Sequence, residues 1–188
     1  IWIYDYKAIN VAKYFKNKSI TLYFCNDFFG KFAFSYEKKI SRIVNYVFST
    51  DLRLEKKFRN YNKDSYFIPH GSWEVINKPN FHKKIKPESI GYIGTINDTL
   101  DTNIFSMILK ETNLKIIIAG PFAECNNDRK KFFEKIFTNE RVDYLGNLKR
   151  NDRELAIKNV DVCMLPYHSK VNGFALKFFD YKSYGKPI

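Results

Sequence analysis

The stretch that decides the fold runs from residue 89 to residue 120 and reads SIGYIGTINDTLDTNIFSMILKETNLKIIIAG. It opens and closes with short apolar runs, at 89–94 and 114–120, and each run ends at a glycine. The segment between them predicts a helix over 101–111, with Asp101 as its N-cap. A strand, a helix and a second strand in this order are typical of a βαβ unit, whose two strands are parallel.

The same alternation extends over most of the chain. Apolar runs predict strands at 1–4, 20–25, 46–49, 66–69, 89–94, 114–120, 142–146 and 161–166. Helical spacing of apolar residues predicts helices at 7–16, 34–44, 51–60, 101–111, 127–137, 151–158 and 173–184. We therefore expect an α/β protein with parallel sheets, right-handed crossovers and helices on both sheet faces.

One segment interrupts this pattern. Periodicity is lost after residue 71, where the chain carries Pro79, Pro87 and the basic run HKKIKP at 82–87. We interpret residues 75–87 as a linker between two Rossmann-like domains, one in residues 1–74 and the other in residues 88–188.

The charge balance favours an acidic partner. The 188 residues carry a formal net charge of +12, and 45% of them are hydrophobic and 18% aromatic. The hydrophobic fraction is typical of a globular protein, and the charge favours nucleic acid, an anionic membrane surface or phosphorylated ligands. An AT-rich genome would produce the same bias towards Lys, Asn, Ile, Phe and Tyr, so the composition leaves both explanations open.

Cysteines and histidines show no pattern of a metal site or a disulfide framework. They are scattered along the chain as Cys25, Cys125, Cys163, His70, His82 and His168. No pair has zinc-ligand spacing, and the number of cysteines is odd. There is also no apolar run of the ~20 residues that span a bilayer, and no signal peptide. We expect a cytoplasmic protein that needs neither a metal ion nor a cofactor.

Candidate binding residues follow from the expected sheets, because ligands of parallel α/β sheets bind beyond the carboxyl ends of the strands. Gly94 and Thr95 follow the strand at 89–94, and Gly120 and Gly146 end two further strands. Tyr167 follows the strand at 161–166. Gly94 would let backbone approach a ligand closely, although a glycine that serves only the turn explains the residue equally well.

The closing helix adds a second group of candidates. Asn172 is a good N-cap, and the amides from Gly173 onward would form a phosphate site at the start of the helix. Lys177 and Asp180 lie about 60° apart around this helix. They form either an exposed ion pair that contributes little to stability or a pair of charges that faces a cleft. The many aromatic residues of the helix favour the cleft.

These residues resemble a known family. Residues 88–188 resemble the nucleotide-sugar-binding domain of GT-B glycosyltransferases of the "group 1" type, in the bacterial branch that makes polysaccharides and teichuronic-type cell-wall polymers. Three stretches carry the likeness: GYIGTINDTLD; IIIAGP with VDYLGNL; and NVDVCMLPYHSKVNGFALKFFDYKSYGKPI. Residues 1–74 resemble, more weakly, the end of the acceptor-side domain, through DF at 27–28, VFSTDLRL and IPHG.

The resemblance implies roles for the candidate residues. Asp180 matches the acid that holds the ribose hydroxyls of the donor. Lys177 matches a lysine that neutralises the diphosphate. Gly94 and Thr95 match the turn beside the donor, and Tyr167 belongs to the Pro-Tyr strand end of the family.

The remaining family positions fall at the start of the closing helix. Gly173 and Phe174 match the segment that faces the donor phosphates and sugar. Asn172 stands where many relatives have a glutamate, so a contact of this residue with the sugar does not follow. In the family a strand and further helices come after Gly-Lys-Pro. We therefore expect both domains to be incomplete and the chain to be a fragment of an enzyme about twice its length.

The resemblance implies a glycosyltransferase that moves a sugar from a nucleoside-diphosphate sugar to a saccharide or lipid-linked acceptor in cell-surface polysaccharide synthesis. It implies no metal ion, and it leaves the catalytic residues unassigned. Basic and aromatic segments at 34–44 and 82–87 further suggest peripheral association with anionic membrane.

Two alternatives belong to other classes. Another type of GT-B enzyme, such as a nucleotide-sugar epimerase, would need catalytic acid and base residues that the sequence does not reveal. A basic nucleic-acid-binding protein would explain the charge, but the chain lacks RNP, zinc-finger and helix-turn-helix signatures. We therefore expect no nucleic acid among its partners.

Overall fold

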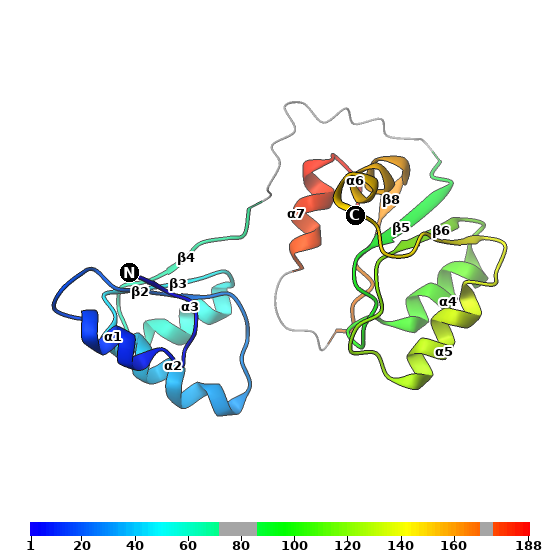
Figure 1. The fold of residues 1–188 in the computed structure, drawn as a ribbon. Helices are drawn as coiled ribbons and strands as arrows, with labels where there is room; N and C mark the ends of the chain where they lie inside the picture. The colour runs from blue at the N-terminus through cyan, green and yellow to red at the C-terminus, as the bar shows by residue number, and fades with distance from the viewer. Residues whose placement is uncertain (72–85, 170–174) are drawn as a thin grey trace. The chain divides into compact units, whose positions relative to one another are not determined.

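The computed structural model describes residues 1–71, 86–169 and 175–188. The chain divides into two compact units. The described part of unit 1 is residues 1–71, and that of unit 2 is residues 86–169 and 175–188. Each unit contains a four-stranded parallel sheet with helices packed against it (Figure 1). The predicted α/β class with two parallel-sheet domains is confirmed. The exact domain boundaries stay a prediction, because most of the expected linker lies outside the described residues.

Unit 1 is built from four strands and three helices in strict alternation. Its sheet has the order β1-β2-β3-β4, and every neighbouring pair is parallel. The strands are β1 (Trp2–Ile3), β2 (Leu22–Cys25), β3 (Tyr46–Ser49) and β4 (Ser65–Phe67). The helices are α1 (Ile9–Phe15), α2 (Lys31–Ile43) and α3 (Leu52–Arg59).

The three helices of residues 1–71 cover one face of this sheet (Figure 1), so the expectation of helices on both faces is not met within these residues. Alternate strand residues point into that layer, among them Tyr23 and Val47, which are fully buried. They meet Ile40 of α2 and Leu54 and Phe58 of α3 in one core cluster. The two-residue period of the strands thus directs one set of side chains into the core.

The opposite face of the sheet carries aromatic side chains. Six rings lie on it, with neighbouring centroids 5.6 to 6.3 Å apart: Trp2, Tyr4, Phe24, Tyr46, Phe48 and Tyr66. Trp2 and Tyr4 are more than half exposed. Much of the aromatic content of unit 1 therefore forms a continuous apolar surface rather than a core.

A buried ion pair joins α2 to α3. Glu37 is fully buried, and one of its carboxylate oxygens lies 2.6 Å from the ammonium nitrogen of Lys57. The side chain of Lys57 is 25% exposed, so this ammonium reaches from the core to the surface of the unit. Removal of Lys57 would leave a buried carboxylate without a counter-charge, which is strongly destabilising.

Unit 2 follows the same plan in a different strand order. Its sheet has the order β7-β6-β5-β8, again with parallel neighbours. The strands are β5 (Ser89–Ile93), β6 (Lys115–Ala119), β7 (Val142–Tyr144) and β8 (Val162–Cys163). The helices are α4 (Thr102–Glu111), α5 (Asn127–Ile136), α6 (Arg150–Asn159) and α7 (Leu176–Ser183).

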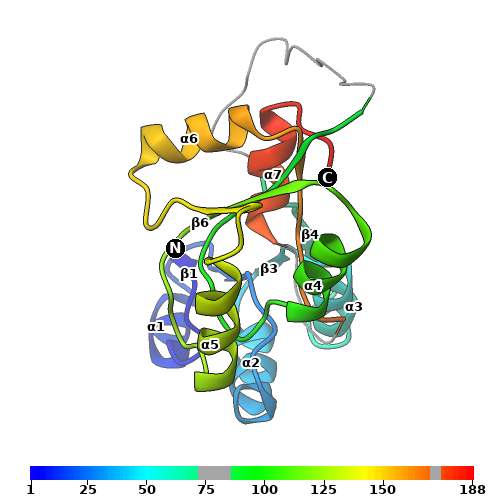
Figure 2. The same cartoon turned by 90° about the vertical axis from the view of Figure 1, so that its right-hand side faces the viewer.

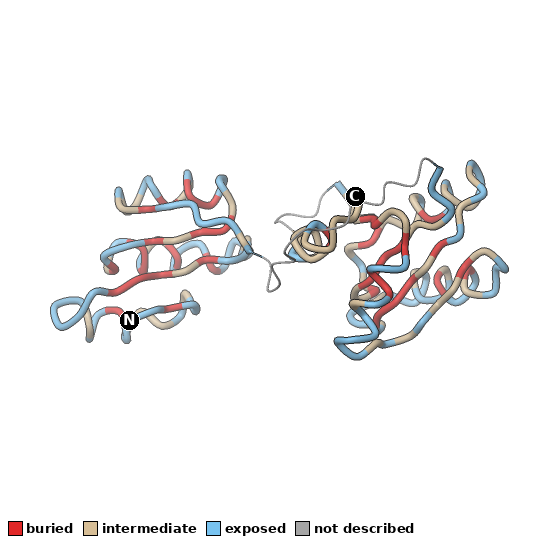
Figure 3. The backbone as a smooth tube through the Cα atoms, turned by 90° about the horizontal axis from the view of Figure 1, so that it is seen from above, coloured by how far each residue is buried: buried red, intermediate tan, exposed pale blue. Residues whose placement is uncertain are grey.

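Helices cover both faces of this second sheet. In Figure 2 α4 and α5 lie on one side of β5 and β6, and α6 and α7 lie on the other. One core cluster contains Phe105 of α4 and Phe133 of α5, and another contains Ile157 of α6 and Tyr181 of α7. Figure 3 shows the buried residues following the strands within each unit. The sheet of unit 2 is therefore a central layer, as expected for a doubly wound domain.

The hydroxyl of Tyr181 extends the hydrogen bonding of β5. Tyr181 is fully buried. Its hydroxyl accepts a hydrogen bond from the backbone N–H of Ile93 at 2.9 Å and donates one to the carbonyl of the same residue at 3.2 Å. Strand β8 pairs only with Ile90 and Gly91, so the side chain of α7 replaces the strand partner that Ile93 lacks on this side.

The Gly-Lys-Pro turn after α7 returns the chain to the sheet. Gly185 has a φ of 66°, a conformation that favours glycine. The ammonium of Lys186 donates to the carbonyls of Lys158 and Val160 at the end of α6. The carbonyl of Pro187 accepts a hydrogen bond from the N–H of Cys163 in β8. The turn thus caps one helix and pairs with an edge strand.

Each strand and helix expected from the sequence is present in the described residues, with shifts at some ends. Helix α2 begins at Lys31 rather than at residue 34, because Gly30 provides the extended cap position. Helix α7 begins at Leu176, with Ala175 in the cap position, rather than at residue 173, and the predicted cap residue Asn172 lies outside the described residues. In the described residues, none of the helices combines the length and apolar character needed to cross a lipid bilayer.

Replacement of Tyr181 by phenylalanine tests the link between α7 and β5. The change keeps the ring and leaves the N–H and carbonyl of Ile93 buried without their partner. We expect a loss of about 1–3 kcal/mol in the free energy of unfolding of unit 2, measured by urea denaturation. Tyr14→Phe, at an exposed ring, is the matched control. Equal stability of the two variants would contradict the assigned role.

Candidate functional site

A small pocket lies at the carboxyl ends of β5, β6 and β7. Its volume is about 110 Å³. The residues that line it are Ile93, Gly94, Thr95, Ala119, Gly120, Pro121, Asn147, Leu148 and Arg153. The pocket therefore occupies the sheet edge at which ligands of parallel α/β sheets bind.

Two glycines shape the floor of this pocket. The N–H of Gly94 donates to the carbonyl of Ala119 at 2.7 Å, and the N–H of Gly120 donates to the carbonyl of Gly146 at 2.7 Å. Gly120 has a φ of 142°, and a Cβ added to it would lie 2.1 Å from the carbonyl oxygen of Gly94. The two strand-end turns are thus in direct backbone contact, which only a glycine at position 120 permits.

Lys177 of α7 lies against the same turn. A Cβ added to Gly94 would lie 1.6 Å from Cε of Lys177, so the lysine side chain passes directly over the glycine. The ammonium of Lys177 lies 3.3 Å from the hydroxyl oxygen of Tyr167. It also lies 5.5 Å and 6.0 Å from the ring centroids of Tyr92 and Tyr167, within cation–π range. The lysine is therefore held at the strand ends by two tyrosines.

Tyr92 connects this lysine to the turn after β5. Its hydroxyl donates a 2.7 Å hydrogen bond to the carbonyl of Thr95. Burial raises the pKa of this hydroxyl above its ordinary value near 10, so Tyr92 stays protonated and keeps donating. The position of Thr95 is thereby fixed by the core beneath it.

Asp180 lies on α7 without forming the ion pair that one sequence interpretation allowed. Among the described residues, its carboxylate has neither an ion pair nor a hydrogen bond, and Lys177 contacts Tyr167 instead. The side chain is only partly exposed. An acid in this setting is available for a ligand hydroxyl.

Arg153 is a basic residue lining the pocket that the sequence analysis missed. It lies in the first half of α6, is exposed, and lines the pocket together with Asn147. The residue is 59 positions from Gly94 in sequence, and no motif marks it. Only the order of the strands, with β6 beside β5 and β7 beside β6, shows that α6 begins at this edge.

A polar network surrounds the outer part of the same edge. The guanidinium of Arg129 lies 3.1 Å from Nε2 of His168 and 3.2 Å from a carboxylate oxygen of Asp98. Nδ1 of His168 lies 3.6 Å from a carboxylate oxygen of Asp101. These contacts join the loop after β5, the loop after β8 and the first turns of α5. The network therefore fixes the backbone next to Tyr167.

The structure brings four of the sequence-predicted site residues together. Gly94, Thr95, Tyr167 and Lys177 lie around the carboxyl end of β5. Asp180 lies one turn after Lys177 on the same helix. The other three predicted residues, Asn172, Gly173 and Phe174, lie outside the described residues. Among residues 1–71, 86–169 and 175–188, no three His, Cys, Asp or Glu side chains gather closely enough to hold a metal ion.

Comparison with known proteins finds proteins that are similar to this chain in structure but none that matches it in sequence. No protein-family model matches the chain, and no curated protein matches it in sequence. A crystal structure of an S. aureus TarM mutant in complex with fondaparinux, alpha-GlcNAc-glycerol and UDP has a TM-score of 0.65, at 13% identity over 91% of this chain and 37% of that one. The apo form of the lipopolysaccharide outer core galactosyltransferase WaaB has a TM-score of 0.57, at 16% identity over 96% of this chain and 59% of that one.

These likenesses establish the fold. The chain has the partial GT-B layout of two Rossmann-like units, as the sequence predicted. It spans 37% and 59% of the lengths of the two solved chains.

Substitution of the two pocket glycines by alanine separates backbone contact from side-chain contact. In Gly120→Ala the new methyl group meets the backbone of Gly94 at a strained φ, so we expect a loss of about 1–3 kcal/mol in unfolding free energy. In Gly94→Ala the atoms nearest to the new methyl group belong to the flexible side chain of Lys177, which can move aside at a cost below about 1 kcal/mol. Thermal unfolding of both variants measures the difference. A Gly120→Ala variant as stable as Gly94→Ala would contradict this geometry.

Proposed function

We propose that this chain is the donor-binding part, with some of the acceptor side, of a glycosyltransferase that uses a nucleoside-diphosphate sugar. The observation that carries the proposal is the position of Lys177. Its ammonium lies over Gly94, at the edge of a parallel sheet where phosphorylated ligands bind. The proposal is supported by the shared fold with two solved glycosyltransferases, one of which contains UDP.

The pocket suits the charge that develops when a nucleoside diphosphate leaves the sugar. Lys177 approaches the end of β5 from α7, and Arg153 reaches the pocket from α6. Two cations from different helices would stabilise the leaving diphosphate through fixed positive charge, without further rearrangement. Under the proposal, this arrangement needs no metal ion.

Asp180 would bind the nucleoside part of the donor. A carboxylate accepts two hydrogen bonds, and the two vicinal hydroxyls of a ribose supply two donors. The partly exposed carboxylate of Asp180 has no partner among residues 1–71, 86–169 and 175–188, so it can make both contacts. Lys177 and Asp180 would therefore divide the donor between them, one holding the diphosphate and the other the ribose.

The acceptor under this proposal is a saccharide or a lipid-linked saccharide of cell-surface polysaccharide synthesis. The support is the chemistry named for the two structural neighbours, of which one is a lipopolysaccharide galactosyltransferase and the other is complexed with alpha-GlcNAc-glycerol. Peripheral contact with an anionic membrane belongs to the same proposal. Helix α2 supports it, because Phe32 is 96% exposed, Tyr36 is 46% exposed, and both lie among lysines.

Titration with UDP and uridine tests the donor site. Lys177→Ala and Arg153→Gln should weaken UDP binding roughly 10- to 150-fold while uridine binding changes little, because only UDP carries the diphosphate. Asp180→Ala should weaken both ligands alike, since both carry the ribose diol. Lys182→Ala, at an exposed lysine on α7, is the control. Calorimetry of the 188-residue chain provides the affinities, and the wild-type value should be the same in EDTA.

Three results would count against this site. The first is that EDTA abolishes UDP binding. The second is that the Lys177 and Asp180 substitutions change the UDP affinity by small and equal amounts. The third is that Lys182→Ala lowers the UDP affinity as much as either of them. Single-stranded DNA serves as a competitor, and displacement of UDP by the DNA at low concentration would favour a nucleic-acid-binding protein instead.

Vesicle flotation tests the membrane contact. We expect the chain to float with phosphatidylglycerol vesicles at low salt and to be released by moderate salt, because each lysine near an anionic surface contributes about 1 kcal/mol. Vesicles of phosphatidylcholine alone are the control. Absence of flotation, or flotation that moderate salt does not change, would remove membrane contact from the proposal.

A further inference from the structure

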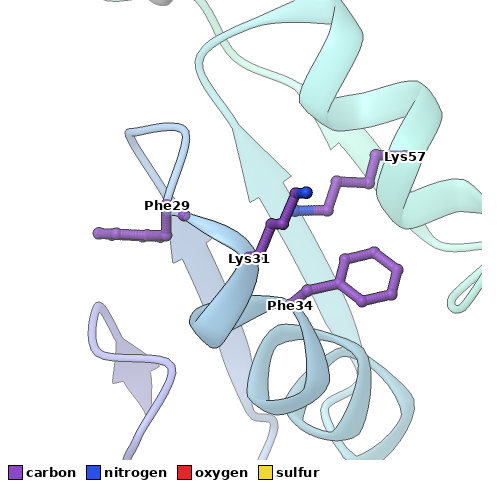
Figure 4. Close-up of a pocket in the computed structure, with 5 residues that line it drawn as sticks. Phe29, Lys31, Phe34 and Lys57 are labelled. Atoms are coloured by element: carbon purple, nitrogen blue, oxygen red, sulfur yellow. The ribbon is translucent and has the colours of Figure 1, made fainter.

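A second pocket lies in unit 1, at the carboxyl end of β2. Its volume is about 430 Å³. It is lined by Phe29, Gly30, Lys31 and Phe34 from the start of α2 and by Lys57 from α3 (Figure 4). The side chains of Lys31 and Lys57 extend towards the same region beside the ring of Phe34 (Figure 4).

The pocket carries more positive than negative charge. Lys57 is neutralised by Glu37, whose carboxylate is fully buried and lies 2.6 Å from the lysine ammonium. Lys31 is exposed, and among residues 1–71 the structure gives its ammonium neither an ion pair nor a hydrogen bond. One full positive charge therefore remains beside the Lys57–Glu37 pair.

The start of α2 adds to this field. The cap residue Gly30 has no side chain to accept from the first amides, and the first turn contains no acidic residue. Lys31 instead places a cation at the positive end of the helix, where a negative charge would be favourable. The uncompensated charge of Lys31 and the positive helix end thus lie beside the Lys57–Glu37 pair, whose carboxylate is buried on the core side.

The pocket also has an apolar wall. It is formed by Phe34, which is 44% exposed and whose ring centroid lies 5.5 Å from the ammonium of Lys57. The ring of Phe29 extends away from the two lysines (Figure 4) and lies 4.8 Å from that of Tyr6. An exposed ring beside an uncompensated cation suits a ligand that combines an anionic group with an apolar face, such as the face of a sugar ring.

We propose that this pocket binds the phosphate of a phosphorylated saccharide, with the sugar ring against Phe34. The inference rests on the proposed transferase function in one respect, because it identifies the phosphorylated saccharide as the acceptor. The phosphate accepts hydrogen bonds from Lys31 and from the ammonium of Lys57 that faces the pocket. The source of the phosphate is either a soluble sugar phosphate or the headgroup of a lipid-linked sugar.

Titration of the 188-residue chain with glucose 1-phosphate tests the proposal, with glucose and inorganic phosphate in parallel. Backbone amide resonances of residues 30–34 report binding by NMR. We expect these amides to shift with glucose 1-phosphate and not with glucose, and Lys31→Gln to weaken the binding about tenfold. Phe34→Ala should weaken the binding of glucose 1-phosphate but leave that of inorganic phosphate unchanged.

Two further variants keep the test specific. Lys39→Gln removes the same charge from an exposed position two turns along α2 and should change the affinity less than twofold. Lys177→Ala tests whether the sugar phosphate binds in unit 2 instead. If it binds in unit 1, the affinity measured at residues 30–34 should be the same in this variant as in the wild type. Lys57 is left intact, because its removal would strand the buried Glu37 and endanger folding.

Several outcomes would overturn the proposal. The first is that the amide resonances of residues 30–34 do not shift with glucose 1-phosphate. The second is that Lys31→Gln and Lys39→Gln weaken its binding equally, which indicates only a diffuse positive surface. The third is that Lys177→Ala no longer binds it. UDP titration of the same sample reports on unit 2 separately. Failure to bind UDP with a normal response to glucose 1-phosphate would count against the transferase function and leave this site standing.

A vesicle arm identifies the source of the phosphate. The same variants are floated with phosphatidylglycerol vesicles. If vesicle binding is lost in Lys31→Gln and in no other variant, the pocket binds lipid headgroups. If Lys31→Gln binds vesicles normally but binds glucose 1-phosphate more weakly, the pocket binds soluble sugar phosphates. Equal losses in Lys31→Gln and Lys39→Gln, in the vesicle and the soluble arms together, count against a built site.

Discussion

The backbone contact between the turns after β5 and β6 is the constraint on which the candidate donor site depends. Strands β5 and β6 pair along five residues, the longest ladder in either unit. Their ends come so close that the carbonyl of Gly94 occupies the space a side chain at position 120 would need. The same absence of a side chain at Gly94 leaves room for the stem of Lys177. Pocket shape and cation position thus follow from one close approach of two strands.

The sequence predicted the elements of the fold well, because strands and helices depend on short-range periodicity. Gly94, Thr95, Tyr167 and Lys177, which the sequence marks as candidates, lie close together in the structure, since residues at strand ends and helix faces can be recognised from local patterns. Arg153 could not be found in this way, because its place in the pocket depends on the order of strands in the sheet. The start of α7 was misplaced because Asn-Gly at 172–173 is a strong cap pattern, whereas the helix begins after Ala175 without any side-chain cap.

The unusual composition of the chain has several separate structural explanations. Some aromatic residues form cores, such as Phe105 against Phe133 and the stacked pair of Phe137 and Tyr144. Others form the exposed face of the first sheet, which the helices of residues 1–71 leave uncovered. The lysines likewise divide between fixed positions, such as Lys186 at the end of α6, and surface positions. Composition alone could not separate these uses, because each needs the same residue types.

The hydrogen bonds between Tyr181 and Ile93 make one backbone amide a local reporter of helix α7. The amide of Ile93 is bonded to a side chain of the helix rather than to a neighbouring strand. Its exchange with deuterated solvent therefore requires movement of the helix, whereas the amides between β5 and β6 exchange only when the ladder opens. Because Lys177 lies one turn before Tyr181, occupancy of the sheet edge becomes visible as slowed deuterium uptake at a residue the ligand does not touch.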